Sequence, residues 1–232
     1  MQNANFLGKK RCIDIIFCID GTGSMSPCIE SVKENARRFY TDFVASMTDL
    51  GSEIDSMRVK VIVFRDYKSD EQEAMLQSPF YELPADDADF SKYLLNITAK
   101  GGCNEDANGL EALFYAMTSD FSIGTNDRQI IVLFADTTAI PLRERNIYPN
   151  YPNDMVDYNG LLETWMCIQG RTTKLRERNK RLVIFAPANT IYEDIKRKFN
   201  RSVFEAVEIH KGLDGIAFKD IIKIIAASAS SA

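Results

Sequence analysis

The residues best suited to chemistry in this sequence are one carboxylate and two hydroxyls at alternating positions, Asp20, Thr22 and Ser24. The glycines between them, Gly21 and Gly23, let the backbone fold tightly enough for the two hydroxyl oxygens to point at one place. Hard divalent cations such as Mg²⁺ take oxygen ligands of these kinds. The spacing therefore predicts a cation site. The competing interpretation is an N-cap cluster at the start of a helix.

A second aspartate favours the cation interpretation, because it also follows a buried strand. The apolar run 13–19 ends at Asp20, and the apolar run 129–135 ends at Asp136. Near-continuous apolar runs are typical of parallel strands that are buried on both faces. Ligands of open α/β sheets bind beyond the carboxyl ends of the strands, so we expect both carboxylates at one sheet edge.

Strands and helices alternate along the chain, which predicts right-handed βαβ crossovers and an α/β fold. We expect a doubly wound, mostly parallel six-stranded sheet with helices on both faces and one short antiparallel edge strand. Apolar residues at spacings of three and four mark the helices. The expected strands are 13–19, 58–64, 75–81, 129–135, 182–186 and 203–209, and the expected helices are 25–47, 90–97, 107–117, 161–174, 190–199 and 218–225.

The composition excludes several function classes. With 232 residues, 45% of them hydrophobic, the chain is sized for one globular domain. A net charge of −5 argues against nucleic acid as a partner, because phosphate binding needs clustered Lys and Arg. We expect no membrane segment and no signal peptide, and hence a cytoplasmic location. The five scattered cysteines and the lone His210, expected at a surface or strand end, form no zinc or disulfide pattern.

The order of Asp20, Thr22 and Ser24 resembles the metal-ion-dependent adhesion site of von Willebrand factor A (vWA) domains. Three further stretches are similar to a bacterial intracellular branch of that superfamily, namely 61–67, 101–113 and 130–136. The resemblance covers nearly the whole chain. It implies an N-terminal extension over 1–11, a vWA-type domain over 12–226 and a flexible tail over 227–232.

The resemblance also implies roles for residues in two loops, the first loop, which follows strand 13–19, and the third loop, which follows strand 129–135. The hydroxyls of Thr22 and Ser24 would bind the ion directly. The carboxylates of Asp20 and Asp136 would act mainly through coordinated waters. The ion implied is Mg²⁺, with Mn²⁺ or Ca²⁺ as alternatives.

In the family, a second loop supplies one more oxygen, and this chain has Asn104 at that place, where the branch that it resembles has an aspartate. An amide oxygen is a neutral and weaker ligand than a carboxylate, and the adjacent Glu105 and Asp106 are alternatives. The loops around the ion would contact a partner through a larger set of residues, which are Gly21, Gly23, Met25, Gly102, Cys103, Glu105 and Thr137.

The function implied is a divalent-cation-dependent protein–protein interaction module, in which an Asp or Glu carboxylate of the partner completes the shell of the ion. One alternative is a metal-independent interaction domain with a degenerate site. Another is a metal-dependent phosphohydrolase, because Asp20-Gly21-Thr22 follows an apolar strand. That chemistry needs a nucleophilic aspartate two positions earlier, where this chain has Cys18, so we expect no enzyme activity.

Two further features have two interpretations each. The run Arg65-Asp66-Tyr67 is either an ion pair that braces the site or a surface turn. The Pro-, Asn- and Tyr-rich connection 140–160 is either a lid or specificity loop beside the same edge, or a packed structural loop.

Overall fold

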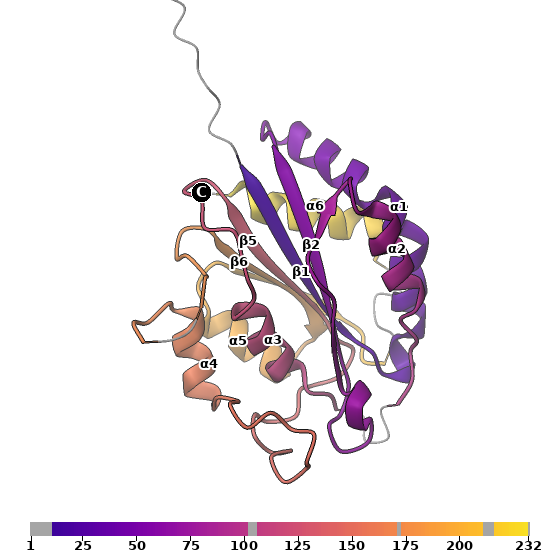
Figure 1. Ribbon diagram of the computed structural model, residues 1–232, viewed down its shortest axis with the longest axis vertical. Helices are drawn as coiled ribbons and strands as arrows, with labels where there is room; N and C mark the ends of the chain where they lie inside the picture. Colours follow the sequence, from indigo (N-terminus) through magenta and orange to yellow (C-terminus); the bar gives the residue numbers. More distant parts are fainter. Residues whose placement is uncertain (1–10, 102–105, 171–172, 211–215, 232) are drawn as a thin grey trace, which may run out of the picture.

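The computed structural model describes residues 11–101, 106–170, 173–210 and 216–231, which form one seven-stranded sheet between two layers of helices (Figure 1). The strand order is β3-β2-β1-β5-β6-β7, and β4 pairs with another stretch of β2. The α/β class and the mostly parallel sheet are thereby confirmed. The parallel strands are β1 (Cys12–Asp20), β2 (Ser56–Phe64), β5 (Arg128–Phe134), β6 (Lys180–Pro187) and β7 (Ser202–Val207).

The helices lie on both faces of the sheet, as the crossover rule requires. Figure 1 shows α1, α2 and α6 on one face and α3, α4 and α5 on the other. The bounds are α1 (Ser26–Asp49), α2 (Asp87–Leu95), α3 (Gly109–Met117), α4 (Tyr158–Trp165), α5 (Ile191–Lys198) and α6 (Phe218–Ser230), with short 3-10 turns η1 (Gly23–Met25) and η2 (Glu71–Glu73). None of the helices within the described ranges has the length and apolar composition of a bilayer span.

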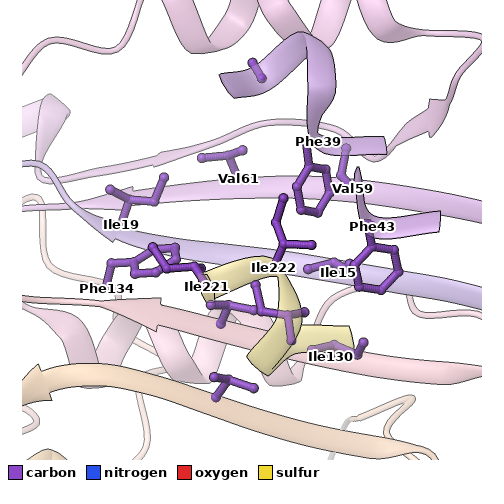
Figure 2. Packing of buried hydrophobic residues seen from close by; sticks show 14 of the residues in the cluster. Ile15, Ile19, Phe39, Phe43, Val59, Val61, Ile130, Phe134, Ile221 and Ile222 are labelled. Atoms are coloured by element: carbon purple, nitrogen blue, oxygen red, sulfur yellow. The ribbon is translucent and has the colours of Figure 1, made fainter. Parts of the chain in front are cut away.

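Each face of the sheet has its own hydrophobic core, which explains why the strands read as nearly continuous apolar runs. On one face, Phe39 and Phe43 of α1 and Ile221 and Ile222 of α6 pack on strand residues such as Ile15 (Figure 2). On the other face, the next strand residues along β1 pack beneath α3, α4 and α5. The helices are therefore packed firmly on the sheet. The loops at the carboxyl edge of the sheet connect these packed elements.

The edge strand expected over 75–81 is two strands, so the sheet has seven strands and not six. They are β3 (Met75–Gln77) and β4 (Tyr81–Leu83), both antiparallel to β2. Between them, the backbone and side-chain hydroxyl of Ser78 bond the backbone of Val61, and Pro79 has no N–H for the ladder.

The prediction of a flexible tail over 227–232 is wrong for the residues described, because α6 continues to Ser230. Arg128 and Arg181, from the starts of β5 and β6, hold its last carbonyls. Arg128 Nε donates to Ala229 O at 2.8 Å, and Arg181 Nη2 donates to Ser231 O at 2.6 Å. Cations are favourable at a helix C-terminus, so this end is ordered by residues that lie far away in sequence.

The helix expected over 161–174 is shorter than the pattern predicts, because α4 ends at Trp165. Cys167 has a positive φ of 55°, and the N–H of Ile168 donates to Glu163 O at 3.1 Å. A left-handed residue followed by such a bond is a common way for a helix to end.

Candidate functional site

The first loop folds back on its own aspartate. Asp20 Oδ1 accepts hydrogen bonds from the backbone N–H of Thr22 at 2.9 Å and from the Thr22 hydroxyl at 2.7 Å. The Thr22 and Ser24 hydroxyl oxygens lie 3.4 Å apart, so both hydroxyls of the motif gather at one place. The N-cap interpretation is wrong, because neither η1 nor α1 has a side-chain cap hydrogen bond.

Asp136 lies at the same sheet edge, two residues after the end of β5. In the parallel pairing of β1 and β5, Phe134 is opposite Ile19, so the two strands end at the same level. Asp136 is fully buried, and neither of its carboxylate oxygens accepts a hydrogen bond from a described residue. The Ser24 hydroxyl is still near enough to lower the pKa of Asp136. The structure thus brings Asp136 to the residues of the first loop.

Burial makes both carboxylates reluctant to ionise. It raises the pKa of Asp20 to about 7, although the hydrogen bonds from Thr22 act in the opposite direction. Burial also raises the pKa of Asp136, partly offset by Ser24 and by His210. The charge of Asp136 contributes to this rise in the pKa of Asp20, because two buried carboxylates repel each other. A positive charge between them would remove this repulsion.

The available oxygens fit a hard divalent cation. Three carboxylate oxygens on buried residues have no hydrogen-bond partner among the described residues, namely Oδ2 of Asp20 and both oxygens of Asp136. Buried polar atoms of folded proteins are almost always paired, so these three oxygens require an explanation. Within the described ranges, no group of three or more His, Cys, Asp or Glu side chains could hold a metal. A cation here would therefore depend on the two hydroxyls as well.

Part of the expected site lies outside the described residues, namely Gly102, Cys103, Asn104 and Glu105. The chain is described again from Asp106, which is half-buried. The next residue, Ala107, bridges Ala139, and its carbonyl accepts the N–H of Ile140 at 3.0 Å. The residues that follow the second loop are thus fixed beside the loop that follows β5.

The expected set of partner-contacting residues needs correction at three positions. Gly21, Met25 and Thr137 are buried, so they hold the loops in place and do not face a partner. Gly23 is exposed, as the expectation requires. The buried positions follow from the tight first loop, which turns Met25 inward at the start of α1.

Arg65 is a buried brace of the first loop, although it is only one residue beyond β2. Its Nε donates to Gly21 O at 3.0 Å, its Nη2 to Thr98 O at 2.8 Å and its Nη1 to Glu73 O at 2.7 Å. One guanidinium therefore joins three segments, and its charge lowers the pKa of Asp20. The surface-turn interpretation is wrong for Arg65. The bracing interpretation holds, but Arg65 bonds carbonyls, and Asp66 forms its ion pair elsewhere.

The connection 140–160 is tied to the rest of the domain by side-chain hydrogen bonds, as the packed-loop interpretation requires. Arg145 Nε donates to Asp66 Oδ1 at 2.8 Å, which ties the loop to the segment after β2. The Tyr151 hydroxyl donates to Glu111 Oε1 at 2.8 Å, which ties it to α3. The proline and tyrosine content of this loop does not reveal these partners, so both interpretations fit the sequence alone.

Sequence reasoning missed the contact of His210 with the third loop. The backbone N–H of His210 donates to Asp136 O at 3.0 Å, and His210 has a positive φ of 60°. Its charge lowers the pKa of Asp136. It is exposed and follows β7, as expected for a strand-end residue. A single histidine without metal-ligand spacing offers no signal of such a contact.

Cys18 occupies the position where the phosphohydrolase alternative needs a nucleophilic aspartate. It is fully buried, its Sγ donates to Ala112 O at 3.7 Å, and burial raises its pKa. A buried thiol of this kind behaves as a small hydrophobic residue. The structure adds nothing in favour of the phosphohydrolase alternative.

No family model matches the chain, and no curated protein matches its sequence. Two crystal structures of the pilus adhesin SpaC from Lactobacillus rhamnosus GG, one of them in an open conformation, are similar in fold. Their TM-scores are 0.54 and 0.51, at 11% and 12% sequence identity. Each match covers 94% of this chain, and this chain spans 30% and 29% of the adhesin chains. At this identity the likeness shows the fold alone.

Proposed function

We propose that this chain is a vWA-type domain that binds a divalent cation, Mg²⁺, at the carboxyl edge of its sheet and binds a partner protein through it. One observation carries the proposal. The side chains of Asp20, Thr22, Ser24 and Asp136 meet at one edge, and three carboxylate oxygens there have no partner among the described residues. Mn²⁺ and Ca²⁺ are the alternative ions.

The charges around the proposed cation favour an acidic group on the partner protein. The carboxylates of Asp20 and Asp136 would balance the charge of a dication, and the hydroxyls of Thr22 and Ser24 would add neutral donors. Arg65 adds a positive charge that acts on Asp20. When bound, the cation supplies a Lewis-acidic position for an incoming oxygen. An Asp or Glu side chain of the partner is the protein group that best fits this position.

We also propose a cytoplasmic location for this interaction. Cys12, Cys18 and Cys167 are free thiols. The reducing conditions of that compartment keep thiols in this state.

Calorimetric titration with Mg²⁺ tests the cation site. The wild type should release or absorb heat on binding, and Thr22→Ala/Ser24→Ala should not. A matched control is Ser46→Ala/Thr48→Ala, because these two hydroxyls bond only carbonyls of their own helix, α1. The control should bind Mg²⁺ as the wild type does. Equal heats for all three proteins would exclude the proposed ligands.

Affinity capture from a cell extract tests the partner. Proteins captured by the wild type in Mg²⁺ should be released by a chelator and should not be captured by Asp136→Ala. Added free aspartate-containing peptide should compete with them. Capture that is insensitive to both the chelator and the substitution would favour the metal-independent interaction domain.

A further inference from the structure

A second group of buried polar atoms lies on the face of the sheet covered by α3, α4 and α5. Its members are side-chain atoms of buried residues that have no hydrogen-bond partner in the described part of the chain, namely Asn108 Nδ2, Glu111 Oε2 and the Tyr192 hydroxyl. Asp20 Oδ2 shares this property. Such atoms are rare in folded proteins, so a group of them requires an explanation.

Tyr192 is the member of this group that comes from a separate element, α5. Its hydroxyl reaches the start of α3, where Gly109 leaves space for it. A Cβ at position 109 would lie 2.0 Å from the Tyr192 oxygen and 3.1 Å from the ring of Phe64. Phe64 is the register partner of Asp20 in the pairing of β1 with β2. The hydroxyl thus lies beside the strand end that carries the cation site.

Alternation along β1 places Asp20 on the same face as Tyr192. Cys18 packs in the core beneath α3, α4 and α5, and Tyr192 belongs to the same core. Residues two apart in a strand point to one face, so the Asp20 side chain is on that side as well. The charges agree with this placement, because burial raises the pKa of Tyr192 most, and Asp20 and Glu111 both raise it as well. A tyrosine hydroxyl is a hydrogen-bond donor, and the free oxygen of Asp20 is an acceptor.

We propose that the Tyr192 hydroxyl is a positioning group for Asp20, and that it donates a hydrogen bond to Oδ2 in the cation-bound protein. This inference rests on the proposed function. Partners behind a metal-binding carboxylate fix its orientation and raise its basicity. In the structure, Oδ1 of Asp20 is already held by Thr22, so Oδ2 is the atom that lacks such support.

Tyr192→Phe tests the proposal by removing one oxygen atom. The Mg²⁺ dissociation constant should rise about tenfold or more, as is typical for the loss of such a partner. The midpoint of urea unfolding in chelator should stay the same or rise, because the lost hydroxyl has no hydrogen-bond partner among the described residues. The matched control is Tyr158→Phe on α4, whose hydroxyl is also buried without a partner among the described residues. It should leave Mg²⁺ affinity unchanged.

A second variant, Gly109→Ala, tests the same contact without changing Tyr192. Its Cβ must displace the Tyr192 hydroxyl, so it should weaken Mg²⁺ binding in the wild-type background and have little further effect on Mg²⁺ binding in Tyr192→Phe. Additive losses of affinity would overturn the proposal. So would Tyr192→Phe with wild-type Mg²⁺ affinity, or with lowered stability and unchanged affinity, which is the result of a purely structural role. If the wild type itself binds no Mg²⁺, the proposed function fails first and this inference fails with it.

Discussion

Without a bound cation, the buried carboxylate of Asp20 should destabilise the folded protein. The substitution Asp20→Asn should therefore stabilise the cation-free protein. Asparagine has the shape of aspartate, and its Oδ1 can still accept the two hydrogen bonds from Thr22. It carries no charge, so it removes both the cost of ionising a buried carboxylate and the repulsion from Asp136. The stability gain should appear only where the wild-type carboxylate is ionised.

The magnitude follows from the pKa of Asp20, which burial raises from 3.8 to about 7. This difference of roughly three pH units corresponds to ~4 kcal/mol. Because the folded-state pKa lies above the unfolded one, the stability is fully present below about pH 4 and is lost as the pH rises toward about 7. In chelator at pH 8, Asp20→Asn should thus be more stable than the wild type by up to ~4 kcal/mol. At pH 4 the two proteins should be nearly equal.

Magnesium should reduce this difference at pH 8. A ligand that binds only the folded state adds about 2.7 kcal/mol at a concentration of one hundred times its dissociation constant. The wild type should gain this stability, and Asp20→Asn should not. Urea unfolding followed by circular dichroism, at pH 4 and pH 8 with either chelator or Mg²⁺, measures all of these differences.

Asp14→Asn is the matched control, because Asp14 is also fully buried and also lies on β1. Its two oxygens accept hydrogen bonds from Arg58 Nε at 2.8 Å and Nη2 at 2.6 Å, so the substitution leaves a half-buried guanidinium short of its partner. It should lower stability at pH 8 and retain the response to Mg²⁺. If Asp20→Asn behaves like Asp14→Asn, the carboxylate of Asp20 does not destabilise the cation-free protein.

Three further substitutions test the surroundings of the site. Glu111→Gln should reduce the pH dependence of stability. Burial raises the pKa of Glu111 from 4.5 to about 7. The wild type therefore loses roughly 3 kcal/mol of stability from this group as the pH rises through that range. Urea unfolding at pH 5 and pH 8 measures this, and equal pH slopes would contradict it. Arg65→Lys should lower the unfolding free energy by ~3 kcal/mol, because an ammonium group cannot serve three carbonyls in the geometry of a guanidinium; wild-type stability would argue against the brace. Gly21→Ala should destabilise by ~1–3 kcal/mol and weaken Mg²⁺ binding, since its Cβ would lie 2.6 Å from Val63 Cγ1. Thermal unfolding and titration of this variant should change together.

The sequence predicted the parts of this structure that depend on local patterns. Continuous apolar runs identified the five parallel strands, and the aspartates at two strand ends indicated the edge where Asp20 and Asp136 meet. Both follow from general rules of parallel sheets, which place strand ends together without regard to the details of the loops.

The parts that the sequence could not predict depend on partners far away in the chain. The end of α6 is ordered by Arg128 and Arg181, and Arg65 braces a loop 44 residues earlier. Tyr192 looks like an ordinary core residue of an amphipathic helix, and only the arrangement of α3 and α5 brings its hydroxyl to Gly109. Such contacts have no periodicity, so no pattern within a window of residues reveals them.

Asp14 and Asp20 show how a structure separates two kinds of buried carboxylate that the sequence presents alike. Both lie on β1, on the same face and without exposure to solvent. Asp14, at the amino end of the strand, accepts hydrogen bonds on both oxygens from Arg58 and from the N–H of Ser122. Asp20, at the carboxyl end, has one oxygen held by Thr22 and one with no partner among the described residues. A carboxylate whose partners are all supplied by the chain stabilises the fold, whereas one left incomplete at the carboxyl edge of a parallel sheet has an oxygen available for a ligand. The free oxygen of Asp20, more than its burial or its residue type, is therefore the feature that distinguishes a binding role from a structural one.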